Sequence, residues 1–161
     1  MKKIGLIELP ALKLVDAEGK NWTAFRKEDP LVSKQVLIPI LLAGGFDAHL
    51  FDLRRGKDET EIGTVTWRGR TLSKVLVGRP FQQLNTRDMD CWGVTVNYMQ
   101  EREPACRLIQ QLSKDRPVVV GGSDAFAEPE PYLKAGATAV VMDKSGAANY
   151  TVLDYALGKQ P

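Results

Sequence analysis

The chain has 161 residues, 43% of them hydrophobic, which is enough to fill the core of one ordinary domain. Its 22 basic and 20 acidic residues are mixed along the sequence and leave a formal charge of +2, so charge gives no argument for a nucleic-acid or membrane partner. We therefore expect a single domain over residues 1–161.

The N-terminus carries an apolar run that Glu8 and Pro10 interrupt early. It is too short and too charged for a signal peptide or a membrane span. Cys91 and Cys106 do not have CxxC spacing, and His49 is the only histidine, so no metal site within this chain is predicted. Buried thiols in a reducing compartment are expected instead, which places the protein in the cytoplasm.

The first half of the chain predicts a strand, a helix and a second strand. The strand is expected at Leu12–Val15, before a loop that contains Asp16. Residues 31–43 are rich in Leu, Ile and Val and favour a helix, in which Pro39 should cause a kink or delay the start. Gly44-Gly45 is a good helix stop, and the second strand follows at 47–53.

Residues 57–85 do not follow the alternation of strands and helices and are interpreted as an insert. Within it, Arg68-Gly69 lies between two β-rich halves at 61–77 and predicts a β-hairpin. The basic residues of this hairpin are interleaved with apolar ones and are typical of a solvated face. Beyond a possible partner surface, the sequence suggests no function for the insert.

The second half predicts three more strands, each followed by a helix. The strands are expected at 91–96, at 117–122 and at 138–143, and the helices at 104–112, 129–135 and 150–157. Continuous apolar strands that alternate with helices indicate a parallel sheet covered on both faces. We predict an α/β fold, a flavodoxin-like (Rossmann-like) doubly wound sheet of five parallel strands in the order 2-1-3-4-5, with an inserted β-hairpin.

Ligands of such sheets bind outside the carboxyl ends of the strands, which directs attention to the exit loops at 16–22, 97–101, 121–125 and 144–149. These loops contain no GxGxxG, GxxxxGK[ST] or GxSxG motif. His49 lies within an expected strand, where a structural role is the simpler interpretation. Asp16 and Glu18 could bind a cation, although two solvated turn residues are the simpler reading. No catalytic residue is assigned.

The exit loops offer backbone and small polar side chains. Gly121 and Gly122 lack a Cβ, so a flat ligand can approach the chain closely, although a tight turn would also explain them. Ser123, Ser145 and Asn149 can orient polar substituents, and 97–100 adds a polar and aromatic surface. Small residues at several strand exits together favour a binding platform over a reaction centre.

The segment 90–157, and more weakly 31–56, resembles the cobalamin-binding domain at the N-terminus of cobalamin-dependent radical S-adenosylmethionine enzymes. The likeness rests on short motifs: Gly93-Val94-Thr95-Val96, Gly121-Gly122, Pro129-Glu130, Leu133, Gly136 and Val140-Val141. The family's fold places the corrin ring over the carboxyl ends of the strands and threads the displaced dimethylbenzimidazole tail into the domain.

The resemblance implies roles for individual residues. Asn97, Tyr98 and Met99 would face the lower side of the corrin, and Gly121, Gly122 and Ser123 would flank the tail. Lys144, Ser145 and Gly146 would close the far side of the tail, and Asp16 is included as the residue after the first expected strand. The DxHxxG motif of another cobalamin-binding group is missing, so the resemblance implies base-off binding without a histidine ligand.

Two departures from the family limit what the chain does alone. Cys91 and Cys106 cannot form the CxxxCxxC motif that holds the iron-sulfur cluster, and DKSG replaces the usual GEGE. We therefore expect a methylcobalamin-binding module that is not catalytic by itself. It would serve a radical S-adenosylmethionine methyltransferase as a domain or subunit, with the cluster and S-adenosylmethionine held by that partner.

A receiver-like signalling or interaction domain is the alternative, because receivers share the predicted sheet order. Asp16 and Glu18 would form the acidic pair, Ser123 would supply the switch hydroxyl, and Lys144 would be the lysine after the last strand. Asn97 stands where the phosphoacceptor aspartate should end the third strand. The alternative is therefore a pseudo-receiver that acts by protein contact.

Overall fold

The computed structural model describes residues 1–23, 32–143 and 146–158. The chain divides into two compact units. The first comprises residues 1–9, 31–51 and 85–161, and the second comprises residues 10–30 and 52–84. The insert expected at 57–85 thus falls almost entirely in the second unit, together with the segment that follows the N-terminal strand.

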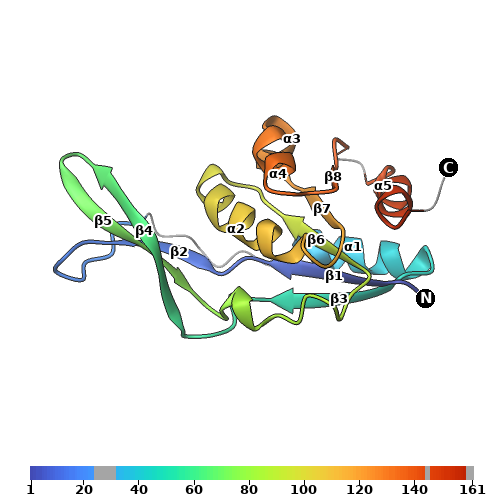
Figure 1. Cartoon of the computed structure of the whole chain (residues 1–161), viewed down its shortest axis with the longest axis horizontal. Helices are drawn as coiled ribbons and strands as arrows, with labels where there is room; N and C mark the ends of the chain where they lie inside the picture. Colours follow the sequence, from blue (N-terminus) through green and yellow to red (C-terminus); the bar gives the residue numbers. More distant parts are fainter. Residues whose placement is uncertain (24–31, 144–145, 159–161) are drawn as a thin grey trace. The chain divides into compact units, whose positions relative to one another are not determined.

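The first unit contains a five-stranded parallel sheet in the order β3-β1-β6-β7-β8 (Figure 1). The α/β class and the five parallel strands agree with the prediction from the sequence. The strands are β1 (Lys3–Glu8), β3 (Asp47–Asp52), β6 (Cys91–Thr95), β7 (Val118–Gly121) and the short β8 (Ala139–Val140).

The predicted strand order was wrong as assigned, because the segment expected as the first strand does not belong to this sheet. Leu12–Val15 lies in β2 (Ala11–Val15), a strand of the second unit. Its place is taken by β1, which pairs with β6 through the register Ile4 to Cys91 and Ile7 to Val94. Ile4 and Ile7 are fully buried, and this burial explains why the N-terminal segment forms a central strand.

Helix α1 (Val32–Ala43) and helix α5 (Asn149–Ala156) cover one face of the sheet. Pro39 lies inside α1 and does not delay its start. The helix ends as predicted, because Gly45 adopts a φ of 80° and the backbone N–H of Phe46 donates to the carbonyl of Leu41 at 3.0 Å. The core of this face joins both helices to three strands and contains Ile4, Leu6, Leu41, Cys91, Val119 and Leu153.

Helix α2 (Arg102–Leu112) covers the opposite face, where it contacts β6 and α4 (Glu130–Lys134). Side chains alternate along a strand, so Trp92 and Val94 point away from the face that carries Cys91. The apolar positions expected at helical spacing are buried on α2: Ala105, Leu108, Ile109 and Leu112. The 3-10 helix Met99–Glu101 and α3 (Ser123–Ala127) were not predicted.

The second unit contains a three-stranded antiparallel sheet in the order β2-β5-β4. Strands β4 (Glu59–Trp67) and β5 (Arg70–Val77) form the predicted hairpin, drawn in green in Figure 1. Both turn residues have positive φ, 46° at Arg68 and 73° at Gly69, as a two-residue hairpin loop requires. Leu72 and Leu76 of β5 are buried, and a 3-10 helix follows at Phe81–Gln83.

None of the helices in the described ranges is long and apolar enough to cross a membrane.

Candidate cofactor-binding site

A cavity of about 470 Å³ lies in the first unit, on the sheet face covered by α1 and α5. Its walls are mainly aliphatic. Helix α1 contributes Val36, Leu37, Ile40 and Leu41, the strands and the residue after β8 contribute Ile4, Leu6, Val119 and Val141, and α5 contributes Leu153. The polar residues that line it come from the ends of strands and helices and from the exit loops: Ser33, Thr95, Asn97, Ser123, Asp143 and Asn149.

Small residues on the floor of this cavity account for its size. Thr95 and Gly121 face α1 and α5 at positions where large aliphatic side chains would otherwise fill the space, whereas the space beside Gly93 is taken by Leu6, whose Cδ2 would lie 2.8 Å from an added Cβ. Thr95 and Gly121 are partners in the β6–β7 ladder, so a short side chain lies next to a residue that has none. A Cβ added to Gly121 would meet only the Cβ of Val141, at 3.9 Å. The space beside Gly121 is therefore open.

Gly122 has a different role from Gly121. Its φ is 108°, and a Cβ at this position would lie 2.3 Å from the carbonyl oxygen of Val96. Only glycine fits here, and the reason is the close approach of two backbone segments. The pair Gly121-Gly122, treated from the sequence as one feature, thus divides into one residue that opens the cavity and one that allows the turn.

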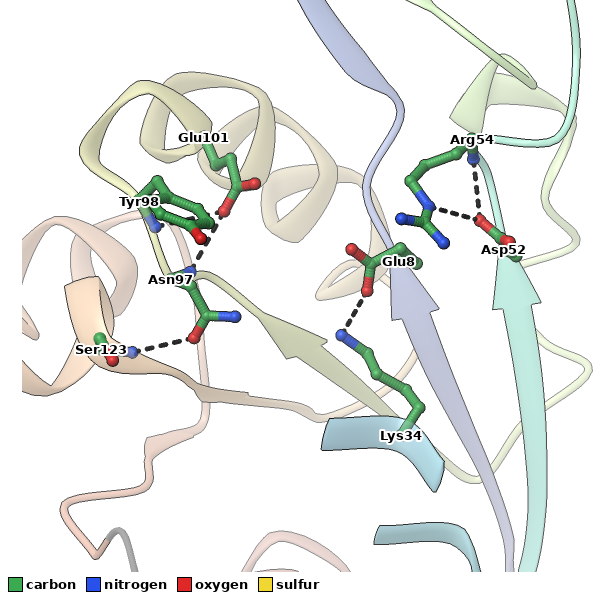
Figure 2. Close-up of polar contacts among 8 residues, drawn as sticks. All are labelled: Glu8, Lys34, Asp52, Arg54, Asn97, Tyr98, Glu101 and Ser123. Atoms are coloured by element: carbon green, nitrogen blue, oxygen red, sulfur yellow. Dashed lines mark hydrogen bonds and ion pairs between the residues drawn. The ribbon is translucent and has the colours of Figure 1, made fainter. Parts of the chain in front are cut away.

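The β6 exit loop is held by hydrogen bonds to its own backbone (Figure 2). The Glu101 carboxylate accepts from the backbone N–H groups of Asn97 at 3.1 Å and Tyr98 at 3.3 Å. The side-chain oxygen of Asn97 accepts from the backbone N–H of Ser123 at 3.2 Å. Asn97 and Ser123, both predicted as site residues, are therefore brought together at the rim of the cavity.

Helix α5 begins at the same rim. The Asp143 carboxylate accepts from the backbone N–H of Ala148, the residue before the helix, at 2.9 Å. Gly146, another predicted site residue, lines the cavity and has a φ of 84°. The side-chain nitrogen of Asn149, the first residue of α5, is buried and has no hydrogen-bond partner within the described structure. A buried amide donor without a partner is rare in folded proteins.

Apolar side chains are exposed beside the rim. Tyr98 is 44% exposed, Met99 is 71% exposed and Phe126, which also lines the cavity, is 38% exposed. Tyr98 and Met99 were predicted to face a corrin ring. Their exposure at the carboxyl end of β6 leaves them available to a large flat ligand or to a partner.

A charged network fixes the β7–α3 segment behind the rim. Arg102 donates to both carboxylate oxygens of Asp124, at 3.0 and 2.9 Å, and to Glu128 at 2.7 Å. The Tyr132 hydroxyl also donates to Asp124. The hydrogen bonds from Arg102 hold the pKa of Asp124 below its ordinary value, although burial acts in the opposite direction. This network ties α2, α3 and α4 together and positions Gly121–Ser123.

Three predicted site residues are not in the described part of this site. Asp16 belongs to the second unit, where it follows β2 and not a strand of the parallel sheet. Its carboxylate accepts from the Trp22 indole N–H at 2.7 Å and from the backbone N–H of Lys20 at 2.8 Å, which organises a turn. Glu18 lies in the same turn, so the acidic pair of the receiver-like reading is not at a strand exit of the parallel sheet. Lys144 and Ser145 lie outside the described residues.

Sequence reasoning missed an ion pair at the carboxyl end of β1. The Lys34 ammonium lies 2.5 Å from the Glu8 carboxylate, as Figure 2 shows, and Lys34 is only 2% exposed. Neither residue stood out, because β1 was not predicted. The contribution of α1 to the cavity was missed as well. The broad apolar surface of this helix was the available signal, since it exceeds what packing on one sheet needs.

Neither cysteine nor His49 is arranged to hold a metal ion. The described ranges contain no group of three or more His, Cys, Asp or Glu side chains that could bind one. His49 lies in β3, where its ring nitrogen is 3.0 Å from an Asp47 carboxylate oxygen. Cys91 is fully buried, and burial raises the pKa of its thiol to about 12.

No protein-family model matches the chain, and no curated protein matches it either.

Proposed function

We propose that the first unit is a cobalamin-binding module. In this proposal the nucleotide tail of the cofactor enters the cavity between α1, α5 and the sheet, and the corrin ring lies over the carboxyl ends of the strands. The module serves a radical S-adenosylmethionine methyltransferase as a domain or a subunit, and that partner holds the iron-sulfur cluster and S-adenosylmethionine.

The observation that carries this proposal is the cavity itself. A space of about 470 Å³ falls in the range of small-molecule sites. It can accept a benzimidazole with its ribose but not a corrin ring, which must stay outside. The aliphatic walls suit the hydrocarbon edges of the base, and the polar rim suits the ribose and phosphate. Gly121 on the floor supplies the room that a flat group needs.

The arrangement of the sheet also supports the proposal. When the strands of this sheet alone are numbered along the chain, the order β3-β1-β6-β7-β8 corresponds to 2-1-3-4-5, the flavodoxin-like order. In that order the connection reverses direction between β1 and β6. Ligands of doubly wound sheets bind at such a switch point, and the cavity is lined by residues of both β1 and β6.

The residues have separate tasks in this proposal. Asn97, Tyr98 and Met99 face the lower side of the corrin, Gly121, Gly122 and Ser123 flank the tail, and Gly146 closes the far side; Lys144 and Ser145 retain the same proposed role. Bound cobalamin supplies methyl-group transfer, and this chain contributes binding, orientation and exclusion of water. No side chain of the described site is asked to act as an acid or a base.

The proposal is tested by equilibrium dialysis of the purified chain against hydroxocobalamin, with the retained chromophore measured by absorbance. We expect near-stoichiometric retention. Gly121→Leu fills the cavity and should abolish retention, whereas Gly121→Ala, the matched control, should reduce it only slightly because of the space beside Gly121. A folded protein that retains no colour would refute the proposal and favour the receiver-like alternative. If Gly121→Leu and Gly121→Ala bind cobalamin equally well, the cofactor tail does not occupy the cavity.

A further inference from the structure

Two indoles and three cations gather at the end of the β4–β5 hairpin, which Figure 1 shows in green. The ring centroids of Trp22 and Trp67 lie 6.0 Å apart. The guanidinium carbon of Arg68 lies 4.7 Å from the Trp67 ring centroid. The Lys20 ammonium and the guanidinium carbon of Arg70 lie 4.3 and 5.0 Å from the Trp22 ring centroid. These are cation–π contacts, and the five side chains are called the hairpin-tip cluster below.

The hairpin-tip cluster carries an excess of positive charge within the described part of the chain. None of its three cations forms an ion pair with a carboxylate of the described ranges. The Asp16 carboxylate accepts from the Trp22 indole N–H at 2.7 Å, and its pKa is lowered first by this hydrogen bond and to a lesser degree by the charge of Arg70. One carboxylate beside three cations leaves a positive potential that attracts an anionic partner.

The acidic residues of β4 lie at the other end of the hairpin and have partners there. A Glu59 carboxylate oxygen is 3.7 Å from the Lys13 ammonium, and the Glu61 carboxylate accepts from the Ser73 hydroxyl at 3.2 Å. The charges of the hairpin are thus separated along its length, and the positive end is the one that carries the indoles.

We propose that the hairpin-tip cluster is a docking site for an acidic segment of a partner protein, whose carboxylates bind Arg68 and Arg70. The proposal goes beyond the proposed cofactor and does not depend on it. It gives a role to the insert at 57–85, for which the sequence suggests no function.

The geometry of the two arginines suits carboxylates. Arg68 and Arg70 are exposed, and only one side of each guanidinium faces an indole, so N–H groups remain available to solvent. Such groups can bind a carboxylate through two parallel hydrogen bonds. Trp67 is 44% exposed beside them. Tryptophan and arginine are the residue types most enriched among those that dominate binding at protein interfaces.

The same contacts disfavour a nucleic acid. Bases stack on open aromatic faces, but two cations and a second indole already surround the ring of Trp22. A nucleic-acid backbone needs a run of cations, and one that followed β4 away from the tip would meet Glu59 and Glu61. A short acidic segment needs only the cations of the tip.

The experiment measures fluorescence anisotropy of two labelled probes, decaglutamate and decathymidylate, which carry nearly the same charge. It uses the intact chain at about 50 mM salt, because exposed charges are screened at higher salt. Two double variants are compared with the natural chain: Arg68→Gln with Arg70→Gln, and Arg68→Lys with Arg70→Lys. Circular dichroism checks that each variant is folded.

The matched control removes the same charge from exposed positions of the first unit, by Arg107→Gln with Lys114→Gln.

We expect the natural chain to bind decaglutamate more tightly than decathymidylate. The double glutamine variant should bind decaglutamate at least about tenfold more weakly, because two charge-assisted contacts are lost. The double lysine variant should lie between the two, since lysine keeps the charge and lacks the planar donors. The control variant should bind within about twofold of the natural chain, because its substitutions lie far from the hairpin in sequence and in the other unit.

Each other outcome would overturn part of the proposal. No binding of decaglutamate, or an equal loss in the control variant, would mean that the hairpin-tip cluster is not a docking site. Equal binding by the lysine variant would remove the role of the guanidinium groups. Tighter binding of decathymidylate would replace the acidic protein segment with a nucleic acid. None of these results depends on whether the chain binds cobalamin.

Discussion

The Cβ that Gly122 lacks would lie 2.3 Å from the carbonyl oxygen of Val96. The two segments are joined by hydrogen bonds on both sides of this contact. The backbone N–H of Val96 donates to the Gly121 carbonyl at 2.8 Å, and that of Asp124 donates to the Val96 carbonyl at 3.1 Å. Backbone hydrogen bonds therefore hold the β6 and β7 exit loops together at the rim of the cavity, and this close contact requires glycine at position 122.

Substitution at the two adjacent glycines should give opposite results. Gly122→Ala combines a positive φ with a backbone clash and should lower the free energy of unfolding by about 2–5 kcal/mol. Gly121→Ala meets no close atom and should change it by less than about 1 kcal/mol. Urea unfolding followed by circular dichroism measures both. Similar losses at the two positions would contradict the division of roles.

Asp124 should make stability depend on pH in the acid range. Its pKa is lowered in the folded state, chiefly by the hydrogen bonds from Arg102, so its stabilisation is fully present above the unfolded pKa, near 4. The stabilisation is lost as the pH falls through the lower folded pKa. Asp124→Asn should cost about 1–3 kcal/mol at pH 7, and the difference from the natural chain should shrink below pH 4.

The free energies of unfolding of the natural chain and of Asp124→Asn are measured by urea unfolding at intervals from pH 7 to pH 3. Gln110→Ala, at an exposed uncharged position of α2, is the control and should leave the pH profile unchanged. A gap between Asp124→Asn and the natural chain that stays constant down to pH 3 would show that the carboxylate charge of Asp124 is not the source of the stabilisation.

Much of the first unit was predictable because its signals are local. The apolar runs at 91–96 and 118–121, the glycine stop after α1 and the spacing of Leu108 and Leu112 each depend on a few neighbouring residues. The hairpin at Arg68-Gly69 was predictable for the same reason. In each case the backbone preference and the apolar pattern indicate the same element.

The remaining features depend on contacts that are distant in sequence. Strand β1 carries charges at both ends, and its six residues were too few to show a period; burial against β6 decides that it is a strand. Leu12–Val15 was recognised as a strand, but its partner is β5, which only the fold reveals. The cavity arises from residues of α1, β6, β7 and α5 together, so the exit-loop residues alone could not predict its depth.

The two cysteines should react at very different rates in the native protein. Cys91 is fully buried with a pKa of about 12, and burial also raises the pKa of the half-buried Cys106 thiol. Little thiolate is therefore present at pH 8. With an aromatic disulfide reagent we expect slow release of one equivalent from Cys106, and of two equivalents in urea. Fast reaction of a Cys106→Ser variant under native conditions would contradict the burial of Cys91.

Replacing Glu8 should destabilise the protein more than replacing Lys34, its partner in the buried ion pair. Glu8→Gln leaves the ammonium of Lys34, which is 2% exposed, without its counter-charge and should cost about 3–5 kcal/mol. Lys34→Met leaves Glu8, which is 22% exposed and can be hydrated, so the loss should be smaller, about 1–2 kcal/mol. The double variant should lose less stability than the sum of the two single losses, because neither charge remains unpaired.

The control is an exposed ion pair. Lys2→Met breaks the pair with Asp90 at 3.4 Å and should cost less than about 1 kcal/mol. Urea unfolding of all four variants measures these values, and additive single losses in the double variant would show that the two side chains do not stabilise each other.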